Sequence, residues 1–94
     1  VPCLNIDYAL ISIDKKEINY LDRKNIKLVQ TPQAFRYDKI LSAYNNQKNA
    51  LDDFSVLINN KKKIKTLIIN GCEKNFKITT ENDMIIAKKI IDEL

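Results

Sequence analysis

Lys77 is the residue whose position in the chain most directly suggests chemistry. It lies between an apolar segment that ends at Ile69 and an acidic stretch that is typical of a helix start. In an open α/β sheet, the edge where strands give way to helices is where ligands bind. Amides at a helix N-terminus also attract anions. A lysine in this loop suits a phosphate group, and an ordinary surface lysine is the alternative interpretation.

The chain contains no histidine and a single glycine, Gly71, and both facts restrict its chemistry. Histidine is the commonest general base, so Ser–His and Cys–His nucleophile arrangements are excluded. One glycine cannot build a GxGxxG or Walker A loop, because both need several residues without a Cβ close to the phosphates. Any reaction must therefore use positioning and positive charge, and these residues hold no classical nucleotide cradle.

Neither the thiols nor the carboxylates form a recognisable metal site. Cys3 and Cys72 are two thiols with no histidine to complete a zinc site, so we expect them to be reduced, with a disulfide as the alternative. Asp52 and Asp53 stand where a helix should begin. Helix capping is the preferred interpretation of this pair, and metal binding is the alternative.

The charge balance favours anionic partners only weakly. The chain has 16 basic and 12 acidic side chains, for a net charge of +4. The densest cluster is Lys61–Lys63 with Lys65, and no aromatic residues interleave with it, so nucleic-acid binding is not expected. A solvated turn is the preferred interpretation of this cluster, and attraction of phosphate is the alternative.

The hydropathy pattern gives neither a membrane span nor a secretory signal. No apolar run approaches the roughly 20 residues needed to cross a bilayer, and the N-terminus lacks a secretory pattern. We therefore expect a cytoplasmic protein with no membrane partner. The first residue is Val1 rather than Met, which suggests a fragment.

The hydrophobic periodicity predicts one α/β domain. Residues 8–13 and 17–21 read as two strands of a hairpin, and residues 26–30 read as a third strand before Pro32. Helices are expected over 38–46, from Asp52 onward, and from Thr80 to the C-terminus, with a strand covered on both faces over 64–69. This order suggests half of an α/β sheet with a protruding β arm.

Two segments carry a family resemblance. Residues 30–35 read QTPQAF, and residues 75–83 read NFKITTEND. In this order and at this separation, they resemble the 2-C-methyl-D-erythritol 4-phosphate cytidylyltransferase family and its ribitol-phosphate relatives, over nearly the whole chain. The resemblance implies the C-terminal part of a Rossmann-like nucleotidyltransferase sheet. Residues 3–21 would be a β-hairpin dimerisation arm, and residues 26–94 the α/β portion.

The implied reaction is transfer of CMP from CTP to a sugar-alcohol phosphate in isoprenoid precursor synthesis, with Mg²⁺. Lys77 corresponds to a catalytic lysine near the reacting phosphates. Arg23 corresponds to an arginine that binds the acceptor's phosphate. In a homodimer it would act in the pocket of the neighbouring subunit. The alternative interpretation of Arg23 is an exposed charge on the arm with no such role. Thr31 would line the substrate site or serve only in a turn. The CTP loop and most Mg²⁺ ligands would lie outside this chain.

Three departures from the family pattern leave the enzymatic role open. The arm usually begins Asp-Thr-Ile-Lys, whereas this chain reads Asn5-Ile6-Asp7-Tyr8. An acidic residue often precedes Asn75, where this chain has Lys74, and Leu51 replaces a common threonine. These changes favour the alternative of a non-catalytic remnant or a binding and dimerisation module. An unrelated small α/β domain is a third possibility. We also expect marginal stability, because half a sheet exposes an edge and an apolar face.

Overall fold

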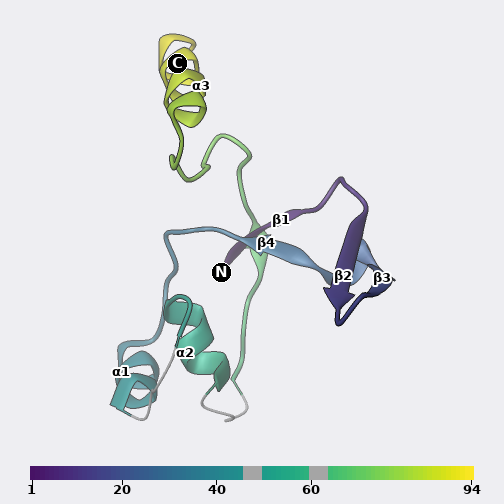
Figure 1. Ribbon diagram of the computed structural model, residues 1–94. Helices are drawn as coiled ribbons and strands as arrows, with labels where there is room; N and C mark the ends of the chain where they lie inside the picture. Colours follow the sequence, from purple (N-terminus) through teal and green to yellow (C-terminus); the bar gives the residue numbers. More distant parts are fainter. Residues whose placement is uncertain (46–49, 60–63) are drawn as a thin grey trace.

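The computed structural model describes residues 1–45, 50–59 and 64–94, which form a mixed α/β structure (Figure 1). The lysine cluster at 61–63 lies outside these described residues. The elements, in chain order, are β1 (Pro2–Asn5), β2 (Leu10–Asp14), β3 (Glu17–Leu21), the 3₁₀ turn η1 (Arg23–Asn25), β4 (Lys27–Val29), α1 (Tyr37–Asn45), α2 (Asp53–Asn59), β5 (Ile69–Asn70) and α3 (Glu81–Asp92).

A three-stranded sheet in the order β4-β1-β5 places the N-terminal strand between two strands from later in the chain. β1 runs antiparallel to β4, where Cys3 faces Val29, and parallel to β5, where Cys3 faces Asn70. The hydrophobic periodicity did not predict β1, because its four residues begin with Pro2 and show no alternating pattern. The central strand is therefore defined by its two neighbours rather than by its own composition.

β5 is shorter than the strand expected over residues 64–69. It pairs with β1 at two positions only, where Pro2 faces Ile69 and Cys3 faces Asn70. The expectation of a strand covered on both faces is wrong for this structure, because Leu67, Ile68 and Ile69 are all exposed. A continuous apolar run indicates which surface could be buried, but burial requires a partner on each face.

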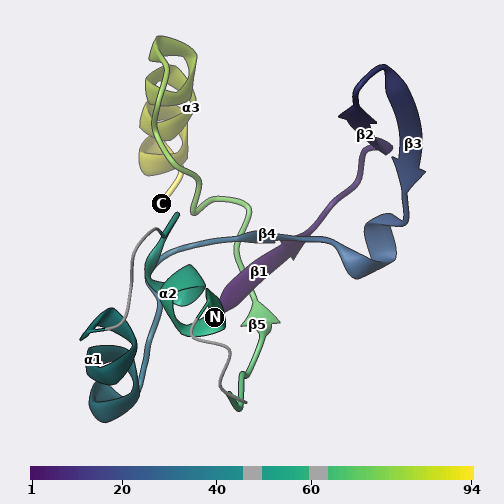
Figure 2. The same cartoon turned by 60° about the horizontal axis from the view of Figure 1, so that its bottom comes forward.

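β2 and β3 form the expected hairpin, which stands away from the three-stranded sheet (Figures 1 and 2). Lys15 and Lys16 form the two-residue turn, both with positive φ (44° and 77°), as the right-handed twist of a tight hairpin requires. The two strands pair from Leu10 opposite Leu21 to Asp14 opposite Glu17. All residues of β3 are exposed.

The small hydrophobic core lies between α1 and α2. Ala43 and Val56 are 1% and 0% exposed, and Leu57 is buried beside them. Partly buried hydrophobic residues pack around this centre, namely Phe35, Ile40 and Ile64. The Tyr44 hydroxyl of α1 donates to the Asp53 carboxylate of α2, and this bond raises the pKa of Tyr44.

α3 is a well-capped helix that extends away from the rest of the chain (Figures 1 and 2). Thr80 is its N-cap, as expected. The Thr80 hydroxyl accepts from the Asp83 amide at 3.1 Å, and the Asp83 carboxylate accepts from the Thr80 amide at 3.2 Å. This is the reciprocal capping box. None of the described helices is long and apolar enough to cross a membrane.

The chain is more open than a self-contained domain of its length. Its radius of gyration is 16.6 Å, whereas a compact domain of this length has about 12 Å. Its accessible surface is 8643 Å², against about 5,600 Å² for a folded monomer of the same mass. The elements therefore carry apolar surface for which the described residues supply no cover.

Candidate functional site

Gln30 fastens the end of β4 to the loop that follows β5. Its side-chain nitrogen donates to the carbonyl oxygens of Cys72 at 2.9 Å and Asn75 at 2.6 Å. Its side-chain oxygen accepts from the Cys72 amide at 3.0 Å. One amide group thus satisfies three backbone groups of the loop, which fixes the loop relative to the sheet. In the sequence, Gln30 stands out only as the first residue of the QTPQAF segment, and no local signal predicts this role.

Asn75 forms a hydrogen bond in the opposite direction, from the loop after β5 to the segment after β4. Its side-chain nitrogen donates to the carbonyl oxygen of Thr31 at 2.7 Å, across 44 residues of sequence. The peptide bond between Thr31 and Pro32 is cis. The two segments that carry the family resemblance are therefore hydrogen-bonded to each other in both directions.

Gly71 permits this close contact. A Cβ at this position would overlap the side-chain oxygen of Gln30 and would lie 3.1 Å from the carbonyl oxygen of Cys3. The backbone of Gly71 has no positive φ, so what glycine provides here is space for the Gln30 amide. The chain's single glycine is thus part of the same contact.

Gln33 connects the motif to the helical layer. Its side-chain nitrogen donates to the Asp52 carboxylate at 3.1 Å, and its side-chain oxygen accepts from the Phe54 amide at 3.1 Å. Asp52 also accepts from the Ser55 amide at 2.9 Å, so the expected capping role is confirmed. The hydrogen bond from Gln33, followed by that from the Ser55 amide, lowers the pKa of Asp52.

Lys77 lies in the loop between β5 and α3, as expected, and its side chain is exposed. Both flanks of the loop are held. Asn75 bonds to Thr31 on one side, and on the other the Asp83 carboxylate accepts from the Thr79 amide and hydroxyl, each at 3.1 Å. These bonds, led by that from the Thr79 amide, lower the pKa of Asp83. The Lys77 ammonium bonds to no other described residue, so it is free to contact an anion.

Arg23 lies at the start of η1, between the hairpin and β4. Its guanidinium donates to the carbonyl oxygen of Asp7 at 2.7 Å, and Asp22 caps the turn by accepting from the Lys24 amide at 3.0 Å. Arg23 lines a depression of about 300 Å³ together with Asn5, Ile6, Lys24 and Lys27. We call this the basic depression, because three of its five lining residues are cations.

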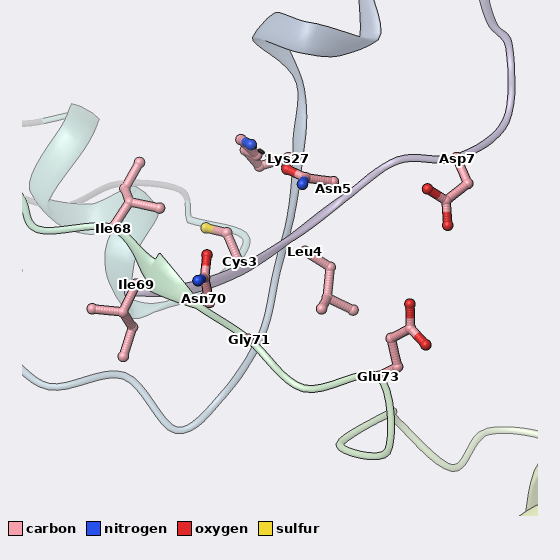
Figure 3. A pocket seen from close by; sticks show the side chains of 10 residues that line it. All are labelled: Cys3, Leu4, Asn5, Asp7, Lys27, Ile68, Ile69, Asn70, Gly71 and Glu73. Carbon is pink, nitrogen blue, oxygen red and sulfur yellow. Dashed lines mark hydrogen bonds between the residues drawn. The ribbon is translucent and has the colours of Figure 1, made fainter.

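A second depression of about 390 Å³ opens at the carboxyl ends of the parallel strands β1 and β5 (Figure 3). Asn70, Asp7 and Glu73 supply polar groups to its lining, and both carboxylates point toward the space between β1 and the loop after β5. We call it the acidic depression. Asn5 and Lys27 line both depressions.

The three expected site residues do not converge within the described chain. Arg23 lines the basic depression, whereas Thr31 and Lys77 line neither depression. Thr31 is linked to the loop that carries Lys77 through the bond from Asn75 to its carbonyl oxygen, and the Thr31 side chain is exposed. Thr31 and Lys77 thus belong to one hydrogen-bonded region, and Arg23 belongs to another.

The described residues do not suit a metal ion by themselves. Over 1–45, 50–59 and 64–94, no group of three or more His, Cys, Asp and Glu residues is placed to hold one. Cys3 and Cys72 are both free thiols. Lys77, Arg23 and the neighbouring lysines carry positive charge, which suits them to contacts with anionic groups.

Comparison with known proteins decides the family. The model of the 2-C-methyl-D-erythritol 4-phosphate cytidylyltransferase family matches residues 2–93. The chain belongs to this family. The resemblance of the QTPQAF and NFKITTEND segments to the 2-C-methyl-D-erythritol 4-phosphate cytidylyltransferases is thereby confirmed, as is an α/β fold with a mixed sheet.

Individual cytidylyltransferases agree with this assignment. The enzyme named 2-C-methyl-D-erythritol 4-phosphate cytidylyltransferase from Caldicellulosiruptor bescii is 41% identical over 87 residues, covering 93% of this chain and 39% of the relative. The enzyme of the same name from Alkaliphilus oremlandii is 41% identical over 90 residues, covering 90% of this chain and 37% of the relative. A protein named Bifunctional enzyme IspD/IspF from Wolbachia sp. subsp. Brugia malayi is 32% identical over 95 residues, covering 99% and 23%. The chain spans about two fifths or less of these relatives.

Proposed function

We propose that this chain supplies acceptor-site residues to an enzyme that transfers CMP from CTP to a polyol phosphate such as 2-C-methyl-D-erythritol 4-phosphate. The observation that carries the proposal is the state of the loop 71–80. Hydrogen bonds hold it on both sides of Lys77, and the Lys77 ammonium itself is left unpaired among the described residues. A fixed backbone with a free cation suits the neutralisation of reacting phosphates.

In the proposed reaction, an oxygen of the acceptor's phosphate attacks the α-phosphorus of CTP. A new phosphorus–oxygen bond forms, and the bond from the α-phosphorus to the bridging oxygen breaks with its electron pair, releasing pyrophosphate. Lys77 stabilises negative charge on the reacting phosphates. Arg23 binds the acceptor's phosphate through a planar guanidinium, which suits a forked contact, and Thr31 lines the site.

Mg²⁺ is part of the proposal only through groups outside the described residues. Those residues offer no set of three metal ligands, so every step assigned to this chain is one of binding, positioning or charge neutralisation. The CTP-binding residues likewise belong to the part of the enzyme that this chain does not match in its relatives.

The separation of Arg23 from Lys77 supports the further proposal of a homodimer with shared sites. The arm, proposed as residues 3–21, would carry Arg23 into the pocket of a partner subunit, with 26–94 as the α/β portion. Exposed apolar side chains on the hairpin support this role, including Ile18 at 63% and Tyr20 at 80% exposure. We also propose a cytoplasmic location, with which the two free thiols agree.

The test measures pyrophosphate release from CTP and 2-C-methyl-D-erythritol 4-phosphate with Mg²⁺. The chain is assayed alone and mixed with the part of the Caldicellulosiruptor bescii enzyme that it does not match. We expect activity only in the mixture, and a loss of about 100-fold or more in Lys77→Ala. The matched control is Lys88→Ala on α3, which removes the same charge and should leave the rate unchanged.

A non-catalytic binding or dimerisation module is the second candidate. Lys74 favours it, because a cation occupies the position where the family often has an acidic residue. If the mixture forms a complex that binds CTP but releases no pyrophosphate, this second candidate replaces the first. Equal rates for Lys77→Ala and Lys88→Ala would likewise remove Lys77 from the proposed mechanism.

A further inference from the structure

The basic depression concentrates positive charge that no carboxylate in its lining balances. Arg23, Lys24 and Lys27 line it, together with the uncharged side chains Asn5 and Ile6. The first two cations come from η1 and the third from β4, so the break between the hairpin and the sheet brings them together. A depression lined by charges of one sign focuses the field and attracts a ligand of opposite charge.

The contacts of these cations are with neutral groups. The Arg23 guanidinium donates to a backbone carbonyl, that of Asp7, at 2.7 Å. The Lys27 ammonium donates to the side-chain carbonyl of Asn5. Neutral oxygens orient both cations without cancelling their charge. An ammonium has three donors and a guanidinium has five, so donors remain for a bound anion.

The adjoining acidic depression has the opposite character. Asp7 and Glu73 bring two carboxylates to it, and Asn70 adds an amide (Figure 3). Hydroxyl groups donate well to carboxylates, whereas a phosphate is repelled by them. Lys27 and Asn5 lie where the two depressions meet, because each of these residues lines the basic depression as well as the acidic depression. A ligand with a phosphate at one end and hydroxyls at the other matches this change from positive charge in the basic depression to negative charge in the acidic depression.

We propose that Lys27, assisted by Lys24, is a specificity-determining residue that binds the phosphate of a polyol phosphate beside Arg23. Ile6, which also lines the basic depression, has no side-chain donor, so the lysines and Arg23 are the cationic donors there. Lys27 keeps its bond to Asn5 and donates its remaining hydrogens to the phosphate. This inference rests on the proposed function for the identity of the ligand, and its test is independent of CTP.

The test uses the 94-residue chain without nucleotide. Glycerol 3-phosphate is titrated into it and followed by the backbone amide NMR shifts of residues 5–7 and 23–27, with glycerol as the uncharged probe. We expect glycerol 3-phosphate to shift these amides and glycerol to leave them unchanged. Lys27→Met should weaken phosphate binding about fivefold, the scale of one exposed charge-assisted hydrogen bond.

The matched control is Lys15→Met in the hairpin turn, which removes the same charge away from the depression. Lys15 lies at the far end of the hairpin, past five paired positions from Leu21. Its removal should change the affinity less than about twofold, because salt screens the interaction of distant exposed charges. Lys27→Arg should keep binding within about twofold of the original chain, and its circular dichroism reports whether substitution at this position disturbs the fold. Adding Ile6→Thr to Lys27→Met should recover part of the lost affinity.

Two results would overturn the inference. Equal weakening by Lys27→Met and Lys15→Met would mean that only the net charge attracts phosphate. Shifts confined to residues outside 5–7 and 23–27 would place the phosphate elsewhere. Loss of CMP transfer with phosphate binding intact would count against the proposed function alone, so the two failures are distinguishable.

Discussion

The side-chain amide of Gln30 occupies the space that a Cβ on Gly71 would fill. Its oxygen would overlap that atom, while its nitrogen reaches the carbonyl oxygens of Cys72 and Asn75. Residues separated by about 40 positions therefore depend on each other: the glutamine needs the glycine's missing side chain, and the loop needs the glutamine's donors and acceptor.

Gly71→Ala should destabilise the chain through this contact. The added methyl meets the Gln30 oxygen and lies 3.1 Å from the Cys3 carbonyl oxygen, so the loop must move. Overpacking of this kind costs about 1–3 kcal/mol, measured as the change in the free energy of unfolding in urea. The control is Gln30→Ala with Gly71→Ala: because the overlapping amide is removed, the alanine at 71 should cost less there. Additive costs would contradict the proposed overlap.

Gln30→Glu should loosen the loop that carries Lys77. The carboxylate cannot donate to the carbonyl oxygens of Cys72 and Asn75, and it repels both. A hydrogen bond of this type contributes about 1 kcal/mol. We expect faster tryptic cleavage after Lys77, followed by mass spectrometry. Asn19→Asp on the exposed strand β3 adds the same charge and should leave the cleavage rate unchanged. Equally faster cleavage in both variants would contradict the role of Gln30 in holding the loop.

The N-terminus of α3 should unravel in acid. Hydrogen bonds from the Thr79 amide and hydroxyl, then from Thr80, hold the pKa of Asp83 below its ordinary value of 3.8. Since the folded-state pKa is lowered, the stabilisation is complete above the ordinary value and is lost as pH falls through the lowered pKa. Amide exchange and shifts over residues 79–84, recorded from about pH 6 to about pH 2, should report this loss.

Thr80→Ala removes the other half of the same capping box. Without the hydroxyl that accepts from the Asp83 amide, α3 should lose about 1 kcal/mol of helix stability near neutral pH. The far-UV circular dichroism signal should fall accordingly. An unchanged helical signal in Thr80→Ala, or shifts of residues 79–84 that are flat down to the lowest pH, would show that this capping box contributes nothing.

The 94-residue chain should melt over a broad range with a midpoint below about 45 °C, the lower end for mesophilic domains. The physical reason is its large exposed apolar surface and its small core, since only four hydrophobic residues are buried among those described, namely Cys3, Ala43, Val56 and Leu57. Scanning calorimetry on a sample shown to be monomeric by sedimentation makes the measurement. A sharp, reversible transition at high temperature in the monomer would contradict this expectation.

Local sequence signals were sufficient for the elements that stabilise themselves. The turn at Lys15 and Lys16 sits between two apolar alternating segments, and the paired strands appear as expected. Thr80 followed by Asp83 places a cap and an acidic first turn before an apolar periodic segment, and α3 begins there. Such features depend on neighbours within about four residues, so they can be read from the chain.

The family was also determined by sequence, because the segments at 30–35 and 75–83 keep their residue types and separation. The sequence showed that Lys77, Arg23 and Thr31 resemble residues of the family. It did not show where these three residues lie relative to one another. Thr31 and Lys77 share one hydrogen-bonded region through Asn75, and Arg23 lies apart from it in the basic depression.

Only the tertiary structure decided the rest. β1 exists because β4 and β5 lie on either side of it, and no local pattern marks it. The contact of Gln30 with Gly71 and the bond from Lys27 to Asn5 join positions far apart in sequence. A residue's type states which bonds it can make, but which partner it meets depends on how distant segments pack. For the same reason, an apolar face shows what can be buried, while its exposure depends on whether another surface covers it.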